Sequence, residues 1–140
     1  MILSNLSVSR LRGVHPDLVR VVRRCAANWK DTGTGFIVTC GTRTLAEQKV
    51  LVAKGASKTL RSRHIPAANG YSHAVDLAAT IDSKVRWDWP LYHRLANAMK
   101  AAAKSEKVPL EWGGDWTTFK DGPHYQLPWK SYPGTAKGKK

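Results

Sequence analysis

Residues 31–40, DTGTGFIVTC, decide how the first half of the chain is built. Asp31–Gly35 has the composition of a turn, whereas Phe36–Cys40 is rich in β-branched and aromatic residues, which predicts a buried strand. Before this stretch, apolar residues recur at helical spacing from Pro16 to Trp29 with arginines largely between them. We therefore expect an amphipathic helix that begins at Pro16 and is followed by a turn and a strand.

Further elements are predicted after this strand. Thr44 and Glu47 form a capping-box pattern for a shorter second helix, and Gly55 stands where its C-terminal cap is expected. Strands interleaved with helices indicate an α+β domain, with about three helices covering one face of a small, mainly antiparallel sheet. The remaining predicted elements are a strand at residues 73–79, a third helix at 90–107 and final strands at 110–112 and 124–127.

Length and composition limit what the chain can be. Its 140 residues, 42% hydrophobic and 24% charged, predict one folded domain over residues 1–133 and a basic, flexible tail over 134–140. No apolar run reaches the roughly 18 residues of a membrane span, and the opening residues lack the order of a signal peptide. We therefore expect synthesis in the cytosol. Cys25 and Cys40 are too few for a disulfide framework and are expected to be reduced core thiols.

The chain is strongly basic. Its 23 Lys and Arg against 10 Asp and Glu give a formal net charge of +13. Such a field attracts nucleic acid, anionic lipid headgroups or an acidic cell-wall polymer. Arg23, Arg24 and the six tryptophans would also suit a non-enzymatic nucleic-acid-binding protein, although no recognisable nucleic-acid motif accompanies them. Charge alone therefore indicates only the sign of the partner.

The five histidines are candidates for a metal site. A catalytic zinc ion keeps three protein ligands, commonly imidazole nitrogens and carboxylate oxygens, and one open position. His15 precedes the first helix, and His93 has no acidic or histidine partner three or four residues away, so both are expected to be structural or solvated. His64 is different, because it lies in a long basic loop, residues 56–71, that runs into the strand bearing Asp76.

Two further histidines compete for the same chemistry. Side chains alternate along a strand, so His73 should face away from Asp76, which favours His64 as the partner of that carboxylate. Asp121 and His124 are joined through a Gly-Pro turn that could aim both groups at one metal. The plainer alternative is a turn aspartate followed by an ordinary strand histidine.

Three motifs together point to a known family. SRH at 62–64, SHAVDL at 72–77 and DGPH at 121–124 resemble the zinc D-alanyl-D-alanine carboxypeptidase family, which includes phage L-alanyl-D-glutamate endopeptidases. The family pattern reads Ser-x-His, then Gly-x-Ala-x-Asp, then acid-x-x-His. Supporting matches are GTRT at 41–44 and WGGDW at 112–116, so the resemblance covers roughly the span from Pro16 to Trp129.

The chain departs from the family pattern in two places. The spacer between His64 and Asp76 is longer than usual, and Ser72 replaces the usual glycine. The extra residues could form a flap that contacts the substrate, or they could move the ligand role to His73. In addition, Gln126 stands where endolysin relatives often carry glutamate, so a contact between this residue and the metal-binding residues is expected to differ.

The resemblance implies a site and a cofactor. It implies that His64, Asp76 and His124 bind Zn²⁺, that Asp121 is the catalytic carboxylate and that Arg43 stabilises the oxyanion. The residues expected to contact the substrate are Ser62, Tyr71 and Trp112.

The resemblance also implies an activity, hydrolysis of the L-alanyl-D-glutamate bond of the peptidoglycan stem peptide by a phage endolysin that lyses the cell wall. Such a protein would be a monomer, made in the host cytoplasm and released to the wall, with its basic surface drawn to lipopolysaccharide. Other possibilities are a D-alanyl-D-alanine carboxypeptidase or dipeptidase on the same fold, and a zinc-stabilised binding module without turnover.

Overall fold

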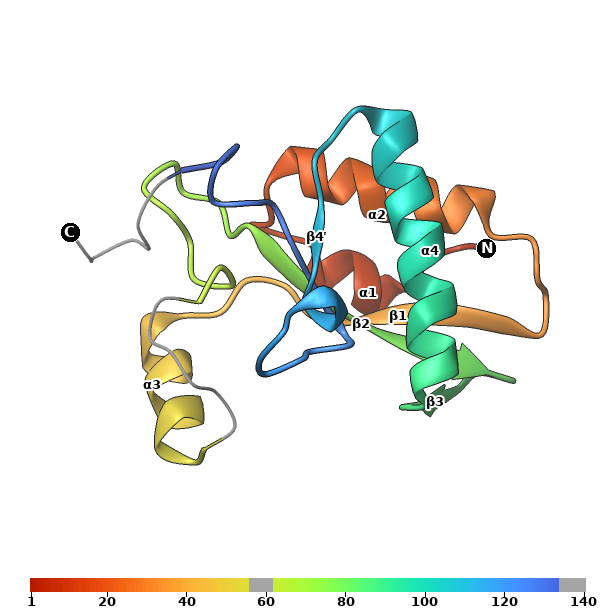
Figure 1. Cartoon of the computed structure of the whole chain (residues 1–140), viewed down its shortest axis with the longest axis horizontal. Helices are drawn as coiled ribbons and strands as arrows, with labels where there is room; N and C mark the ends of the chain where they lie inside the picture. The colour runs from red at the N-terminus through yellow and green to blue at the C-terminus, as the bar shows by residue number, and fades with distance from the viewer. Residues whose placement is uncertain (56–61, 134–140) are drawn as a thin grey trace.

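The computed structural model describes residues 1–55 and 62–133 (Figure 1). This part of the chain holds four α-helices and one five-stranded sheet, which confirms the predicted α+β class. The tail predicted over 134–140 and part of the basic loop, 56–61, lie outside the described residues. The helices are α1 Asn5–Arg10, α2 Pro16–Asn28, α3 Leu45–Ala53 and α4 Trp89–Glu106, and the strands are β1 Thr34–Cys40, β2 Ala74–Ile81, β3 Lys84–Arg86, β4 Glu111–Trp112 and β5 His124–Gln126.

The helix ends follow the local chemistry of the sequence. Helix α2 begins at Pro16 as predicted, and the His15 side chain accepts a hydrogen bond from a first-turn amide. Helix α3 has the full capping box of Thr44 and Glu47. Helix α1 was not predicted, and neither was β3, which follows a tight turn at Asp82 and Ser83 where both backbones have positive φ.

The strand order places β2 at the centre of the sheet. The path runs β1-β2-β5-β4, β3 pairs with the far end of β2, and every pairing is antiparallel. A register shift between Val38 and Cys40 sets Cys40 opposite Asp76, and on the other side of β2 His124 is opposite Asp76. The sheet thus brings three potential ligands into one row across three strands.

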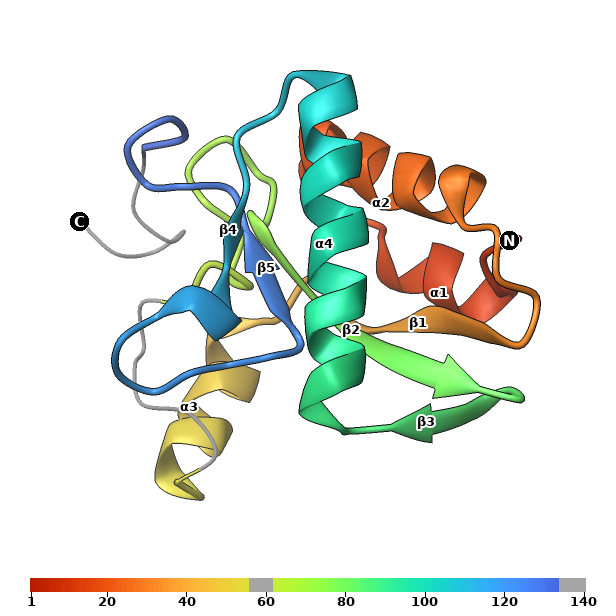
Figure 2. The ribbon, with the colours of Figure 1, turned by 45° about the vertical axis from the view of Figure 1, so that its right-hand side comes forward.

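Helices α2 and α4 form the layer that buries the core. They cross and pack on each other, α4 also contacts β2, and α1 packs on β1 (Figures 1 and 2). Leu18, Leu77 and Met99, from α2, β2 and α4, are fully buried. Burial of each such side chain contributes about 1.5–3 kcal/mol to the free energy of folding. Helix α3 stands apart from this layer in both views. Among the described residues, no helix combines the length and the apolarity needed to cross a membrane.

Candidate metal centre

Asp76 lies between two imidazole rings near the start of β2. Its Oδ1 is 3.1 Å from Nε2 of His64 and 3.2 Å from Nδ1 of His124. The loop before β2 supplies His64, and pairing of β5 with β2 supplies His124. Both histidines are almost fully buried, at 2% and 7% exposed. The structure therefore brings together the three residues that the resemblance implies as metal ligands.

In both histidines the outer ring nitrogen, the one that does not face Asp76, lies at hydrogen-bond distance from an oxygen atom. Nδ1 of His64 is 2.8 Å from the carbonyl oxygen of Gly41, and Nε2 of His124 is 2.7 Å from Oε1 of Gln126. A carbonyl or amide oxygen can only accept, so each outer nitrogen carries the proton and donates. With a metal ion bound, the nitrogens that face Asp76 would present their lone pairs to the ion, as in metal-binding histidines whose other N–H is held by an oxygen, whereas without an ion a proton can take that place on His64.

The donor set fits a zinc ion. Zinc binds imidazole nitrogen and carboxylate oxygen at about 2.0–2.2 Å in tetrahedral geometry, which separates neighbouring ligand atoms by about 3.3 Å. The 3.1 and 3.2 Å separations around Asp76 are close to that value. Calcium and magnesium prefer sites made of oxygen atoms. Two imidazoles and one carboxylate therefore match zinc better than either of those ions.

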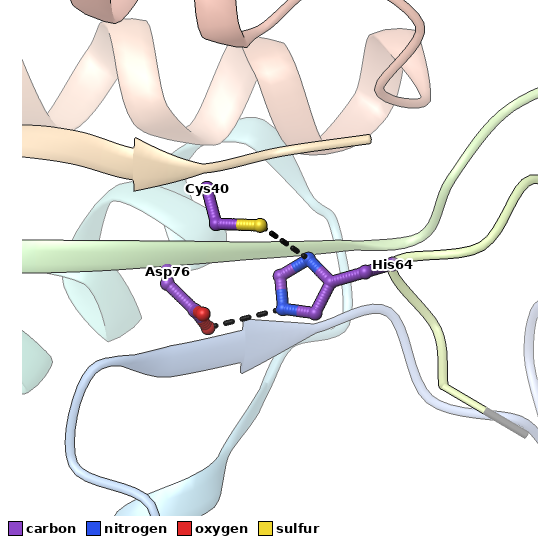
Figure 3. Close-up of side chains that lie close together, drawn as sticks. All are labelled: Cys40, His64 and Asp76. Carbon is purple, nitrogen blue, oxygen red and sulfur yellow. Dashed lines mark hydrogen bonds and ion pairs between the residues drawn. The ribbon is translucent and has the colours of Figure 1, made fainter. Parts of the chain in front are cut away.

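Cys40 is a further neighbour of this cluster (Figure 3). Its Sγ lies 3.8 Å from Nδ1 of His64 and accepts a hydrogen bond from Nη2 of Arg43 at 3.3 Å. Cys40, His64 and Asp76 each offer one ligand atom, and these atoms lie within 4.8 Å of one another. Both cysteines are free, and Cys25 is buried in the core as predicted. The same prediction is wrong for Cys40, because the register shift in β1 sets it opposite Asp76, half-buried beside the candidate site.

The cluster behaves electrostatically as an ion pair shared by three groups. Burial opposes the charge on Asp76, but the two imidazoles outweigh it and hold the pKa of this carboxyl far below its usual range. Burial likewise opposes the charge on His64, but Asp76 outweighs it and raises the pKa of His64 to about 10. For Cys40, burial would raise the pKa of the thiol, and His64 with Arg43 turns the net shift downward.

Asp121 and Arg43 border the cluster from two different loops. The 3₁₀ turn Gly113–Asp115 holds the loop of Asp121, whose amide donates to the carbonyl of Gly113 at 3.0 Å. A Cβ at Gly113 would stand 2.4 Å from the carbonyl oxygen of Asp121, so only glycine allows this approach. Arg43 donates to Oε1 of Gln48 at 2.7 Å, and its Nη2 is 3.9 Å from Oδ2 of Asp76.

The three residues expected to contact substrate lie in different surroundings. Ser62 Oγ accepts from the amide of His64 at 3.1 Å, so it fixes the loop that carries this histidine. Trp112 is 2% exposed and donates to the carbonyl of Gly122 at 2.7 Å. Tyr71 is 41% exposed and its ring lies 5.6 Å from that of His15. Their contacts with substrate remain predictions.

His73 belongs to a different group of side chains. It is 1% exposed, its Nε2 is 3.1 Å from Nδ2 of Asn69, and its ring packs against His15 and Tyr132. Burial, together with Arg63 and His15, lowers the pKa of His73 to about 4. The longer spacer folds into a turn at residues 67–71 that supports this group. His15 caps α2 and His93 is exposed, as expected for structural and solvated histidines.

The fold and the site define a class, an α+β domain with a buried histidine–aspartate–histidine cluster on its central strand. Residues 1–127 match the family described as Phage L-alanyl-D-glutamate peptidase, and the chain belongs to this family.

Individual relatives agree with this assignment. The chain is 32% identical over 124 residues to an L-alanyl-D-glutamate peptidase of Listeria phage A118, covering 88% of this chain and 41% of that protein. It is 25% identical over 122 residues to the peptidoglycan L-alanyl-D-glutamate endopeptidase CwlK of Bacillus subtilis strain 168, covering 81% and 73% of the two chains. The chain therefore spans less than half of the Listeria phage relative.

A solved structure extends the likeness to three dimensions. The crystal structure of the Serratia marcescens L-Ala D-Glu endopeptidase ChiX superposes with a TM-score of 0.82 at 42% sequence identity. The match covers 94% of this chain and 93% of the Serratia chain. The predicted family resemblance and the predicted fold are thereby confirmed.

Proposed function

We propose that the chain is a zinc-dependent endopeptidase that hydrolyses the L-alanyl-D-glutamate bond of the peptidoglycan stem peptide. The observation that carries this proposal is the approach of one carboxylate oxygen of Asp76 to nitrogens of both His64 and His124. The names of the relatives supply the scissile bond. Cell-wall lysis by a phage endolysin would follow from this activity.

In this proposal, His64, Asp76 and His124 hold the zinc ion. The chemistry that a bound zinc ion supplies is Lewis acidity, which polarises a carbonyl and acidifies water at neutral pH. Arg43, held by Gln48 and by Cys40, would donate to the scissile carbonyl oxygen as negative charge develops on it. Guanidinium suits this role because it stays charged and presents donors in a fixed fork.

Asp121 would accept a proton from the attacking water and pass it to the leaving amine. Burial, assisted by the negative charge of Asp76, raises the pKa of Asp121 above its usual range. A raised pKa brings a carboxyl closer to the pH at which it must both accept and release a proton. The two carboxyl groups would therefore have different roles. Asp76 would stay ionised as a metal ligand, and Asp121 would exchange protons.

The decisive experiment is digestion of purified peptidoglycan, with the products identified by mass spectrometry. The zinc-loaded chain should create new D-glutamate amino termini. Asp121→Asn should lower the rate by about 10²–10⁴-fold with zinc content unchanged. Asp115→Asn is the matched control, because Asp115 lies on the same loop but is exposed and paired with Lys100, and its rate should be unchanged.

The other outcomes of this digestion separate the rival functions. Release of terminal D-alanine would indicate a carboxypeptidase or dipeptidase. Zinc binding without any cleavage would indicate a binding module. Tight DNA binding at physiological salt, again without cleavage, would favour the nucleic-acid reading of the net charge of +13. Equal rates for the wild type and Asp121→Asn would remove Asp121 from the proposal.

The basic surface would bind the anionic cell envelope. Exposed cations such as Arg12, Arg23 and Lys30 on and around α2 would face phosphates of lipopolysaccharide or wall carboxylates. Vesicles containing lipopolysaccharide should bind the chain at low salt and release it as ionic strength rises, since screening shortens the attraction to about 10 Å at 0.1 M. Light scattering should report a monomer. The location in the host cytoplasm before release belongs to the same proposal.

A further inference from the structure

Arg63, next to the candidate ligand His64, is a buried cation that has no carboxylate partner at hydrogen-bond distance among residues 1–55 and 62–133. It is 4% exposed, and within the described residues its Nε and Nη1 have no hydrogen-bond partner. Its Nη2 donates to the carbonyls of Leu127, at 3.2 Å, and of Tyr132. The guanidinium carbon lies 3.7 Å from the ring centroid of Trp129.

Such an arrangement is costly for stability. Burial lowers the pKa of Arg63 to about 10, so the group is still a cation at neutral pH. A buried charge that lacks an opposite charge and leaves donors unpaired destabilises a fold relative to an apolar side chain of similar size. The contacts of Arg63 are therefore better explained by the geometry they impose than by the stability they add.

The contacts of Arg63 close a ring of three hydrogen bonds. The amide of His73 donates to the carbonyl of Arg63 at 2.8 Å, and the amide of Leu127 donates to the carbonyl of His73 at 2.9 Å. Nη2 of Arg63 then donates to the carbonyl of Leu127 and completes the ring. Two of these links are backbone bonds, and the third depends on the Arg63 side chain.

Each member of the ring lies on a segment that carries one candidate ligand. Arg63 directly precedes His64, His73 leads into β2 and Asp76, and Leu127 directly follows β5, which begins at His124. The ring thus ties the three ligand-bearing segments to one another at a point outside the metal cluster. Because a zinc site requires its ligands at fixed separations, a link of this kind prepares the site before the ion arrives.

We propose that Arg63 is a positioning residue, which sets the mutual spacing of His64, Asp76 and His124 by closing this ring through its side chain. The inference rests on the proposed zinc function. It predicts that loss of the Arg63 donors weakens zinc binding without removing any ligand.

The test compares Arg63→Met with Arg10→Met in the otherwise intact chain. Arg10 also donates from a partly buried guanidinium to a backbone carbonyl, that of Val38 at 2.9 Å, but it joins α1 to β1 rather than two ligand-bearing segments. Zinc affinity is measured by competition with a chelator, cobalt substitution reports coordination geometry through its visible spectrum, and thermal melting of the zinc-free chain reports stability.

Arg63→Met should bind zinc about 10–100-fold more weakly and alter the cobalt spectrum. Arg10→Met should keep both properties even if its melting temperature falls as much. If Arg63→Met does not fold, Arg63→Lys serves instead, since one ammonium group replaces the fork, and zinc affinity should still fall several-fold. An unchanged zinc affinity and cobalt spectrum, whatever the melting temperature, would overturn the inference. A wild-type chain that binds no zinc would overturn the proposed function itself, and this inference with it.

Discussion

His64 and His73 lie at the two ends of the same loop and are almost equally buried, at 2% and 1% exposed, yet their surroundings shift their pKa values in opposite directions. The pKa of His64 rises to about 10, and that of His73 falls to about 4. Burial disfavours the charged form in both cases. The neighbours make the difference, because the carboxylate of Asp76 faces His64, whereas the cation Arg63 acts on His73.

The comparison shows that burial alone does not distinguish the proposed metal ligand His64 from His73. A ligand histidine needs an anion or another ligand at one ring nitrogen and an acceptor at the other. His64 has both, in Asp76 and the carbonyl of Gly41. At His73, one ring nitrogen meets the amide of Asn69, and the other, Nδ1, has no hydrogen-bond partner within the described part of the chain.

The largest effect is expected when the imidazole of His64 or of His73 is removed, which tests whether His64 and not His73 binds zinc. His64→Ala deletes one of three proposed ligands and should cost about 3–5 kcal/mol of zinc-binding free energy, a factor of roughly 150 to 5,000 in affinity. His73→Ala should keep zinc, because its ring lies with His15 and Tyr132. Metal analysis after dialysis, followed by chelator competition, measures both. Zinc loss in His73→Ala with retention in His64→Ala would move the site.

The opposite pKa shifts predict opposite dependences of stability on pH in the zinc-free chain. For His73, the folded pKa of about 4 lies below the ordinary value of 6.5. Its contribution is therefore complete above pH 6.5 and is lost as the pH falls toward 4, by on the order of 3 kcal/mol at most. For His64, the contribution is complete below pH 6.5 and is lost as the pH rises toward 10.

Urea unfolding at several pH values, on the wild type and on His73→Phe, measures these slopes. The variant should lose the dependence between pH 4 and 6.5 that belongs to His73 and should keep the alkaline decline of His64. Carboxyl groups such as Asp121 titrate in both proteins, so the difference between the two curves isolates His73. Identical curves in the acid range would mean that the imidazole of His73 is not held neutral by the fold.

Much of this contrast could be predicted from the sequence. Strand alternation separated His73 from Asp76, and the helices α2 and α4 began within a residue of their predicted starts because proline marks both. Helix α1 and strand β3 were missed because six and three residues are too short to show a period.

Other features depend on contacts between distant segments. Cys40 reached the site through a register shift between β1 and β2, which the alternation of a single strand cannot reveal. The ring through Arg63, His73 and Leu127 joins three such segments, and one of its links is a side chain bonded to a backbone carbonyl. Such a bond leaves no periodic signal in the sequence, so only the assembled sheet shows it.

The smallest expected effect concerns the outer nitrogen of His124. Gln126→Leu removes the oxygen that receives this N–H and should weaken zinc binding about 10–100-fold, whereas Asn69→Leu, which removes the neighbour of His73, should not change it. Chelator competition measures both, and equal affinities in Gln126→Leu and the wild type would show that the contact does not orient His124.

Gln126→Glu tests the same contact with His124 in a second way. A carboxylate would hold the N–H of His124 more firmly, but Nε2 of Gln126 donates to Oε2 of Glu111 at 3.3 Å. Glutamate at this position would lose that donor and face a like charge in a buried place, so its gain at His124 should be largely cancelled. Glutamine therefore suits this chain because Glu111 is its neighbour, and Gln126→Glu combined with Glu111→Gln should bind zinc more tightly than Gln126→Glu alone.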